Sequence, residues 1–344
     1  MEHGAARWVR PALLPGALAV LAGALLVGVL VGPVSLSPGR VLLELADRLP
    51  LISVDSGLSD REAAIVWELR APRVLLGGLV GAVLALAGGA YQGVFRNPLA
   101  DPYLLGVAAG AGFGATLGIA YSGTLPVAVP VAAFIGAVLA VAATYALGSA
   151  VGGRRTGTTL ILAGVAVAAF FTAAQTFVQQ RESDTIREVF SWILGRLGTA
   201  GWGDVRRVLP YAALAGFVIL LHRRLLDVLA VGEEEAATLG VHVGRVRLVV
   251  VLAATLGTAA AVAVSGLIGF VGIVVPHTVR LLAGSSYRSI LPLSIVGGAA
   301  FLVLADLVAR TALSPAEMPI GVVTAVVGAP FFAVVLRTSR KVAG

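Results

Sequence analysis

The stretch at residues 248–279, LVVVLAATLGTAAAVAVSGLIGFVGIVVPHTV, decides the fold, because none of its 32 residues carries a formal charge. A straight helix of that length would extend about 48 Å, well beyond the hydrocarbon core of a bilayer, which is about 30 Å thick. The stretch therefore predicts two membrane spans with a break between Ser265 and Gly266. Three glycines and Pro276 after the break predict a distorted helix, which is tolerated only against protein or a cavity.

The same apolar character extends along the whole chain of 344 residues. Hydrophobic residues make up 58% of it and charged residues 12%, which is outside the composition of soluble domains. The first apolar run lacks a cleavage site followed by polar sequence, so it is interpreted as a span rather than a signal peptide. We predict an all-α polytopic membrane protein with a single transmembrane domain, residues 1–344, of about ten transmembrane helices. The expected spans are residues 12–32, 74–94, 103–122, 125–150, 158–178, 206–222, 246–264, 266–284, 290–309 and 318–336.

Ten spans place both termini on one side of the membrane, and the positive-inside rule selects that side. With the termini in the cytoplasm, the inner loops and tails hold 14 basic and 6 acidic residues, whereas the outer segments hold 11 basic and 12 acidic residues. Both termini are therefore expected to be cytoplasmic. The net charge of +7 reflects this asymmetry and does not indicate nucleic-acid binding.

Several classes of chemistry are excluded by composition. The chain has no cysteine, which removes disulfides, thiolate metal sites and thiol catalysis. Its four histidines are too scattered to form a metal-ligand pattern. Lys341 is the only lysine, so a phosphate-binding loop of the G-x-x-x-x-G-K-[ST] kind cannot be present. We expect no catalytic residue, no metal site and no cofactor in this chain, which is then not an enzyme by itself.

A polar segment, GEEEAATLGVHVGRVR at residues 232–247, separates the sixth and seventh spans on the cytoplasmic side. Three successive glutamates suit the start of a short helix, where negative side chains offset the helix dipole. Gly240 suits the left-handed position that ends such a helix, and Gly244 permits a second turn. The segment therefore predicts a compact helix pair, which indicates a docking surface; a solvated loop is the alternative.

Two outer segments are predicted to form surface helices. Ser59 and Glu62 match the capping-box pattern and start a helix that is expected to end at residues 70–73, at the mouth of the second span. Thr185 and Glu188 match the same pattern, and apolar residues at helical spacing over 186–197 predict an amphipathic helix at the outer interface.

Two further features indicate how the spans pack. Glycines recur at every fourth position over residues 106–118, and again at 77 and 81, which lets helix backbones approach closely in lipid. Near the outer end of the ninth span, Asp306 precedes Arg310 by four residues. A local ion pair between them is the simplest account of an acid at that depth.

Five blocks of this sequence together resemble the membrane permeases of binding-protein-dependent ABC importers for iron–siderophores, haem and vitamin B12, the FecCD-type or BtuC-like family. The resemblance implies a type II ABC importer architecture, in which a dimer of ATPase subunits binds ATP and Mg²⁺. It also implies an extracytoplasmic binding protein and a second permease, either another copy or a paralogue. The blocks lie at residues 70–112, 160–167, 232–247, 265–282 and 306–332.

The resemblance assigns roles to three regions. The cytoplasmic helix pair would dock into the ATPase subunit, and three outer arginines, Arg70, Arg73 and Arg310, would receive acidic residues of the binding protein. Two short segments would narrow the cytoplasmic end of the pathway, although a structural turn is the alternative there. The gate segments are Asn97, Pro98, Leu99, Gly157, Thr158 and Thr159. The ATPase-docking residues are Glu233, Glu234, Glu235, Ala236, Ala237, Leu239, Gly240, Val241, Gly244 and Arg245.

The expected function is that of a permease which moves a bulky metal chelate across a bacterial cytoplasmic (inner) membrane. The alternative is a secondary active transporter driven by an ion gradient, which would need internal repeats and intramembrane ionisable residues in both halves. Neither is evident in the sequence. The choice among siderophore, haem and corrinoid, and between a homodimer and a heterodimer, stays open at this point.

Overall fold

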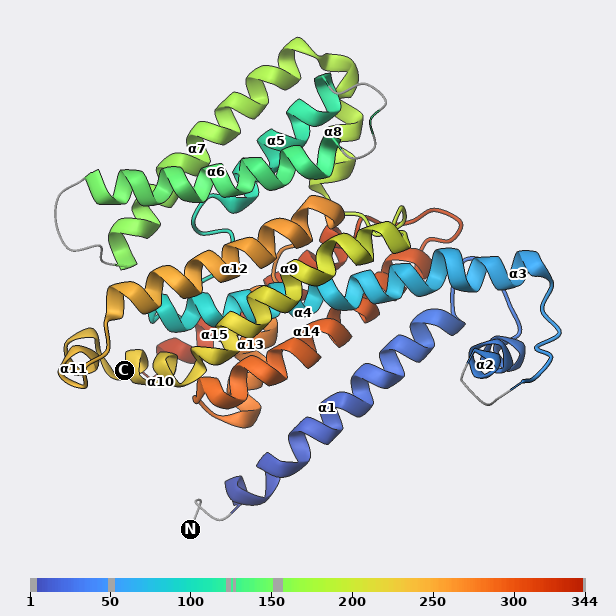
Figure 1. Cartoon of the computed structure of the whole chain (residues 1–344), viewed down its shortest axis with the longest axis horizontal. Helices are drawn as coiled ribbons and strands as arrows, with labels where there is room; N and C mark the ends of the chain where they lie inside the picture. Colours follow the sequence, from blue (N-terminus) through green and yellow to red (C-terminus); the bar gives the residue numbers. More distant parts are fainter. Residues whose placement is uncertain (1–4, 49–52, 122–124, 126–127, 151–156, 343–344) are drawn as a thin grey trace.

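The computed structural model describes residues 5–48, 53–121, 125, 128–150 and 157–342. Each of the ten expected spans overlaps one helix of the described chain (Figure 1). These helices are α1 (Ala5–Leu30), α4 (Ala71–Phe95), α5 (Val107–Tyr121), α6 (Ala128–Ala150), α7 (Gly157–Arg181), α9 (Trp202–Leu221), α12 (Val243–Ser265), α13 (Val271–Ala283), α14 (Tyr287–Thr311) and α15 (Ile320–Val342). Shorter helices lie between these spans, namely α2 (Pro38–Asp47), α3 (Asp60–Ala64), α8 (Ile186–Ile193), α10 (Arg223–Val231) and α11 (Glu233–Thr238).

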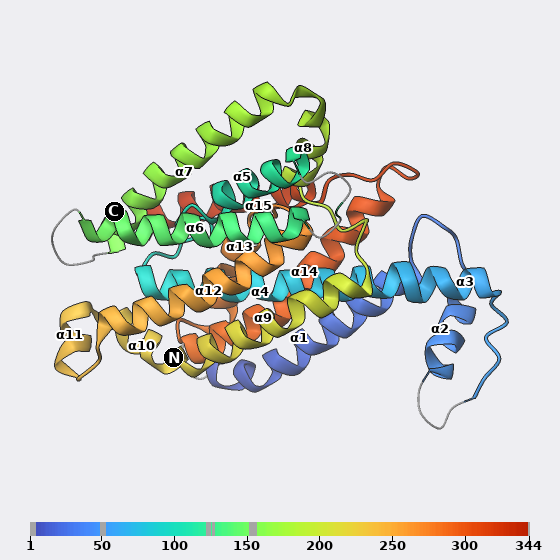
Figure 2. The same cartoon turned by 45° about the horizontal axis from the view of Figure 1, so that its top comes forward.

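Six helical segments of the described chain are long and apolar enough to cross a membrane, and α5, α13 and the apolar part of α15 are shorter apolar helices. The continuous helical segment that contains α4 is the most buried of the six, with 83% of its apolar window inside the protein. Figure 2 shows α4 running through the middle of the molecule, with α12, α9 and α14 around it. Helices α5, α6 and α7 form a layer that packs against α12. These helices confirm the prediction of an all-α, multi-pass membrane protein.

The break predicted in the uncharged stretch of residues 248–279 is present. Helix α12 ends at Ser265, and Gly266 adopts a left-handed backbone with φ of +69°. Glycine is required there because a Cβ atom would lie 2.1 Å from the carbonyl oxygen of Trp192. Residues 266–270 are not helical, and α13 begins only at Val271. The eighth span is therefore shorter than the predicted 266–284, since its first residues form a non-helical entry to α13.

The capping box of Ser59 and Glu62 is confirmed, but the helix that it starts does not end at residues 70–73. It continues through a π-helical segment, Ile65–Arg70, directly into α4. In that segment the N–H of Ala71 bonds to Val66 rather than Trp67. The carbonyl of Trp67 is thereby released and accepts a hydrogen bond from the indole of Trp202 at 2.8 Å. The π segment thus joins the second span to the start of α9.

The second predicted capping box is wrong. The hydroxyl of Thr185 donates to the carbonyl of Glu182, and Thr185 makes no cap bond to α8. The surface helix itself is confirmed, as α8, but it ends at Ile193. Val189 and Trp192 are its buried side chains, because α8 rests on the bundle through a face that the apolar spacing only partly identified.

The predicted close helix packing is confirmed at two crossings. A Cβ atom on Gly81 of α4 would lie 2.2 Å from the carbonyl oxygen of Gly298 in α14. The same relation joins Gly110 of α5 and Gly136 of α6, at 2.2 Å. Only glycine fits at such distances, so the two pairs of helices touch backbone to backbone. Gly110 belongs to the four-residue glycine repeat, which therefore forms the α5–α6 contact.

Candidate docking, gate and transport sites

The polar segment at residues 232–247 forms one short helix, α11, whose ends agree with the predicted chemistry. Its first turn consists of the three glutamates, Glu233 to Glu235. Gly240 has φ of +79°, and the N–H groups of Gly240 and Val241 bond to the carbonyls of Ala237 and Ala236, both at 3.0 Å. This pattern is a Schellman motif, in which a left-handed glycine ends the helix. The motif confirms Gly240 as the stop signal.

The predicted second helix of the pair is not separate. Gly244 lies inside α12, which begins at Val243, so the chain enters the seventh span immediately after the turn. The preceding helix, α10, is instead the partner of α11. Sequence reasoning missed α10 because residues 223–231 have no capping signal and continue the apolar sixth span.

The side chains of this segment divide into a buried and an exposed set. Ala236 is fully buried on the inner face of α11, so its docking role stays a prediction, which this burial disfavours. Arg247 is 5% exposed and forms an ion pair with Glu233, which fixes α11 on α12. Leu239, at the C-terminal end of α11, is 70% exposed. The exposed residues of the predicted docking set are Glu233, Glu234, Glu235, Ala237, Leu239, Gly240, Gly244 and Arg245, with Val241 half-buried.

Asp227 on α10 provides a second anchor, which the sequence analysis did not identify. Its carboxylate accepts hydrogen bonds from the N–H of Tyr287 at 2.6 Å and from the hydroxyl of Ser286 at 2.9 Å. Both donors belong to the start of α14, where a negative charge also offsets the helix dipole. The only signal in the sequence was the N-cap serine at position 286. The α10–α11 unit is thus tied to α14 at one end and to α12 at the other.

From this anchor a chain of contacts leads into the membrane domain. The guanidinium of Arg280 lies 5.3 Å from the ring centroid of Tyr287 and donates to its hydroxyl at 3.1 Å. Arg280 also donates to Gln92 at 3.3 Å, and Gln92, which is 1% exposed, donates to the carbonyl of Gly272 at 3.2 Å. The contacts link α10, α14, α4 and the start of α13. A displacement of α10 therefore has a direct path to the broken helix.

The first gate segment lies in a turn after α4. Arg96 ends that helix in a left-handed conformation, with φ of 51°. The side chain of Asn97 accepts the N–H of Leu99 at 2.9 Å, which fixes the turn around Pro98. Pro98 is exposed and Leu99 is half-buried. The helix therefore ends at Phe95, before Pro98, which lies in the turn.

The second gate segment approaches the same place. Gly157 begins α7, and a Cβ atom at this position would lie 3.2 Å from the ring of Phe95, the last residue of α4. Thr158 is exposed and Thr159 is half-buried. The structure thus brings the two predicted segments together at one end of the bundle. Their gating role stays a prediction.

A tyrosine that the sequence analysis did not single out connects this region to the broken helix. The hydroxyl of Tyr103 donates to the carbonyl of Ile268 at 3.0 Å and accepts the N–H of Ile268 at 3.1 Å. Both bonds satisfy backbone groups in the non-helical residues 266–270. The loop after α4 and the break after α12 therefore form one unit.

At the opposite end of the bundle, Arg73 lies between two carboxylates. It donates to Asp306 at distances of 2.9–3.1 Å and to Glu317 at 2.8 and 3.0 Å. Asp306 is 2% exposed, whereas Glu317 is 38% exposed. The predicted pair of Asp306 with Arg310 is confirmed at 3.5 Å. It is the longer of the two contacts of Asp306, since Arg73 is the closer partner.

Arg70 and Arg310 are not on the outer rim. They are 4% and 1% exposed, and their guanidinium groups donate to carbonyls at the end of α1. Arg310 bonds to Gly28 at 2.6 Å, and Arg70 bonds to Val29 and Leu30 at 2.9 and 2.8 Å. These bonds satisfy carbonyls that the end of a helix leaves without partners. Their direct contact with a binding protein stays a prediction, which this burial disfavours.

Long apolar helices, together with a broken helix that polar contacts link to the α10–α11 unit, define a multi-pass membrane protein. Comparison with known protein families identifies the family to which the chain belongs. Residues 19–338 match the model of the FecCD transport family. The chain belongs to this family.

Individual relatives agree with that assignment. The chain is 43% identical to the cobalamin import system permease protein BtuC of Halobacterium salinarum, over 82% of this chain and 75% of that one. It is 39% identical to the hemin transport system permease protein HmuU of Yersinia pestis, over 80% and 84% of the two chains. It is 36% identical to the Fe(3+)-citrate import system permease protein YfmD of Bacillus subtilis, over 89% and 91%.

A solved structure has the same fold over nearly the whole length. It is described as an inward-facing conformation of a metal-chelate type ABC transporter, and it is 30% identical to this chain. The TM-score is 0.83, with 95% of this chain and 99% of the other covered. The resemblance predicted from five sequence blocks is therefore confirmed at the level of family and fold.

Proposed function

We propose that this chain is the membrane-spanning permease subunit of a binding-protein-dependent ABC importer for a bulky metal chelate. The relatives are named for cobalamin, hemin and iron(3+)-citrate import, which supports this class of cargo. The observation that carries the proposal is the anchored α10–α11 unit with its exposed Leu239. A unit that lies at the end of the bundle and is anchored to two spans can transmit the movement of a docked partner to those spans.

In this proposal the ATPase subunits bind ATP and Mg²⁺, and they dock on the exposed residues Ala237, Leu239 and Arg245. Movement of α10 is passed through Asp227 to the start of α14, and from there through Arg280 and Gln92 to the break after α12. Both termini lie in the cytoplasm, and the chain resides in a bacterial cytoplasmic membrane. Two copies, or this chain and a paralogue, enclose one pathway.

The outer ionic contacts support a docking role for Arg73, provided that one of its present ionic partners can be displaced. Arg73 is already paired with Glu317, so an acidic residue of the binding protein would have to take the place of that carboxylate. Glu317 is partly exposed and can move away, whereas Asp306 is buried and holds Arg73 in position. Rim charges of this kind set encounter rate and register more than affinity.

The secondary transporter is the weaker proposal. It needs a buried ionisable group that gains and loses the coupling ion. Among the described residues of the spans, Asp306 is the buried carboxylate, and it lies between Arg73 and Arg310. The charge of this carboxylate is already balanced by two guanidinium groups, so it does not suit the binding of a coupling cation.

The test is reconstitution of this chain in proteoliposomes with its ATPase and binding protein. Chelate-loaded binding protein should stimulate ATP hydrolysis, and chelate should accumulate inside only with ATP. Leu239→Arg should abolish both activities, while Val54→Arg, at an exposed position in the loop before α3, tests for a general effect of a new charge. Uptake driven by an ion gradient in the absence of ATP would contradict the proposal.

A further inference from the structure

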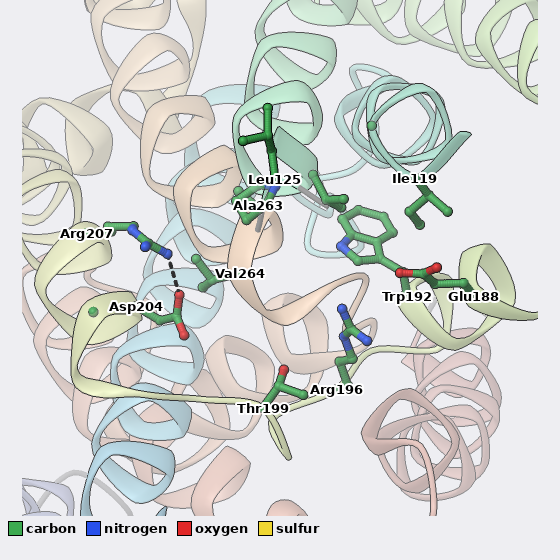
Figure 3. Close-up of a pocket in the computed structure, with 14 residues that line it drawn as sticks. Ile119, Leu125, Glu188, Trp192, Arg196, Thr199, Asp204, Arg207, Ala263 and Val264 are labelled. Atoms are coloured by element: carbon green, nitrogen blue, oxygen red, sulfur yellow. Dashed lines mark hydrogen bonds and ion pairs between the residues drawn. The ribbon is translucent and has the colours of Figure 1, made fainter. Parts of the chain in front are cut away.

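A polar cavity of about 500 Å³ lies where the outer ends of α5, α6, α9 and α12 meet α8 (Figure 3). Its walls carry two arginines and two acids beside apolar side chains. In Figure 3, Glu188, Trp192 and Arg196 lie together on one side, and the pair of Asp204 and Arg207 lies on the other. None of these residues belongs to the docking or gate segments. The cavity is therefore not explained by the proposed function.

The charges in this cavity are only partly used inside the protein. Arg207 donates to Asp204 at 2.8 Å, and Asp204 also accepts the N–H of Gly201 at 3.1 Å. In the part of the chain that the structure describes, the side chains of Glu188 and Arg196 form neither a hydrogen bond nor an ion pair. Arg196 is half-buried and Glu188 is exposed. The cavity thus presents one cation and one anion, side by side, to a ligand.

A second, apolar hollow of about 460 Å³ continues from this cavity into the membrane region. The two hollows share Pro130, Arg207, Ala263 and Val264. The second one runs over α12 between α6 and α9, and Figure 1 shows α12 lying between these two helices. Among its lining residues are Phe134 and Tyr211, whose ring centroids are 5.6 Å apart. A polar chamber thus opens into an apolar groove at the level where spans enter the bilayer.

We propose that the combined hollow binds one phospholipid with an amine headgroup, of the phosphatidylethanolamine type. Arg196 and the free side of Arg207 hold the phosphate, Glu188 holds the ammonium group, and an acyl chain occupies the groove between α6 and α9. Guanidinium groups are suited to phosphate oxygens, and a carboxylate beside them is suited to an ammonium group. The apolar groove argues against a small soluble ion as the ligand, because such an ion would occupy only the polar cavity and leave the groove without an occupant.

The position of the site agrees with this occupant. By the charge distribution of the loops, the ends of α5, α9 and α12 that form the cavity face outward, so the lipid would come from the outer leaflet. Helices α6 and α9 expose further apolar side chains, including Val131 on α6 beside the groove, which is 48% exposed. The site would fix α6 and α9 to α12 from outside. This inference requires only a membrane protein and does not depend on the transported substrate.

Native mass spectrometry of the purified, delipidated full chain tests the inference by lipid titration. Arg196→Gln removes the phosphate contact without breaking a bond within the described protein, and Val131→Trp fills the groove from an exposed position. Each should weaken phosphatidylethanolamine binding about tenfold, the effect expected for loss of a charge-assisted contact or of chain access. The matched controls are Arg206→Gln, an exposed neighbour of Arg207 outside both hollows, and Leu139→Trp, on the same helix as Val131.

Four ligands separate the possible occupants. Phosphatidylethanolamine should bind most tightly, and diacylglycerol, phosphatidylglycerol and chain-free glycerophosphoethanolamine should each bind at least tenfold more weakly. Equal binding of any of these three, or equal effects of the variants and their controls, would overturn the proposal. Loss of self-association in Val131→Trp would also overturn the proposal, because it would show that a second copy of the chain, and not a lipid, covers the groove. These results are independent of ATP-driven uptake, so a failure here leaves the importer proposal intact.

Discussion

Asp227 and Tyr287, which are 60 residues apart, are joined by a hydrogen bond of 2.6 Å between the carboxylate and the backbone N–H. The bond connects α10, the helix before α11, to the first residue of α14. Tyr287 is 4% exposed and also receives Arg280 against its ring. The α10–α11 unit is therefore connected to the membrane domain through a defined polar contact as well as by its chain ends.

Asp227→Ala is expected to uncouple ATP hydrolysis from uptake. It removes the acceptor of two hydrogen bonds, so α10 can move without moving α14. A bond to a charged group contributes about 1.5–3 kcal/mol, so the folded state should survive. The measurement is the number of chelates accumulated per ATP hydrolysed in proteoliposomes. Asp60→Ala, which changes an exposed acid at the start of α3, is the control; equal coupling in both variants would contradict the role of Asp227.

Leu239→Arg is expected to abolish co-purification of the ATPase subunit while leaving the permease folded. Leu239 is 70% exposed, so a charged side chain there costs the monomer little but cannot be buried in an interface. Copurification from membranes and the thermal midpoint of the isolated permease are the two measurements. Gly240 is unsuitable for this test, since its φ of +79° would strain any other residue. Normal complex formation by Leu239→Arg would show that the ATPase subunit docks on another surface.

Glu317→Gln is expected to strengthen binding of the binding protein at low salt, because it frees one side of Arg73 for an incoming carboxylate. Arg73→Ala should instead destabilise the fold by about 3–5 kcal/mol, since it leaves the buried Asp306 with the longer contact to Arg310 alone. Surface plasmon resonance at two salt concentrations and thermal unfolding separate the two effects. Arg61→Ala, an exposed arginine on α3, serves as the control. An unchanged dissociation constant in Glu317→Gln would argue against docking at Arg73.

Sequence patterns predicted the helical spans well because each pattern depends on residues that are close together in the sequence. The break at Gly266 and the stop at Gly240 both need a left-handed backbone, which glycine adopts without strain. The capping box of Ser59 and Glu62 also involves only four neighbouring residues. The similar pattern at Thr185 failed because the hydroxyl bonds backward to Glu182 instead. A capping pattern does not specify which of two local bonds a threonine makes.

The candidate sites were less predictable, since they depend on contacts between distant parts of the chain. Ala236 carries no sign in the sequence that it faces inward, and its burial follows from packing of α11 on its neighbours. The sequence predicted that Arg70 and Arg310 are charges on the outer surface. Both instead donate hydrogen bonds to carbonyls at the end of α1, more than 30 residues away in sequence. Asp227 was counted only as an inner charge. Its role appears once α14 is placed beside α10.

The pH dependence of stability should report on Asp101, in the loop between α4 and α5. Burial raises the pKa of this carboxyl to about 6, while the N–H of Tyr103 at 2.8 Å partly opposes the shift. The folded state therefore holds a proton that the unfolded state releases near pH 4. The contribution of this proton to stability is complete below about pH 4 and is lost as the pH rises through about 6.

Asp101→Asn is expected to remove that pH dependence and to raise the thermal midpoint at pH 7 by a few degrees. The amide oxygen can still accept the N–H of Tyr103, so the turn is kept. Thermal unfolding in detergent from pH 4 to 7.5 is the measurement, with Asp55→Asn, in an exposed outer loop, as the control. A variant that follows the same curve as the unaltered protein would show that Asp101 titrates normally.

Leu99→Cys tests whether the turn after α4 narrows the pathway. The chain has no native cysteine, so a single introduced thiol reports without background. If two permeases enclose one pathway, the two thiols should cross-link in the nucleotide state that closes the cytoplasmic end and separate in the state that opens it. Thr158→Cys, at the start of α7, should change in the same direction, because Gly157 packs against Phe95 at the end of α4. Ser149→Cys, exposed at the end of α6, is the control. Cross-linking of Leu99→Cys that is absent or equal in every nucleotide state would leave the turn as a structural element without a gating role.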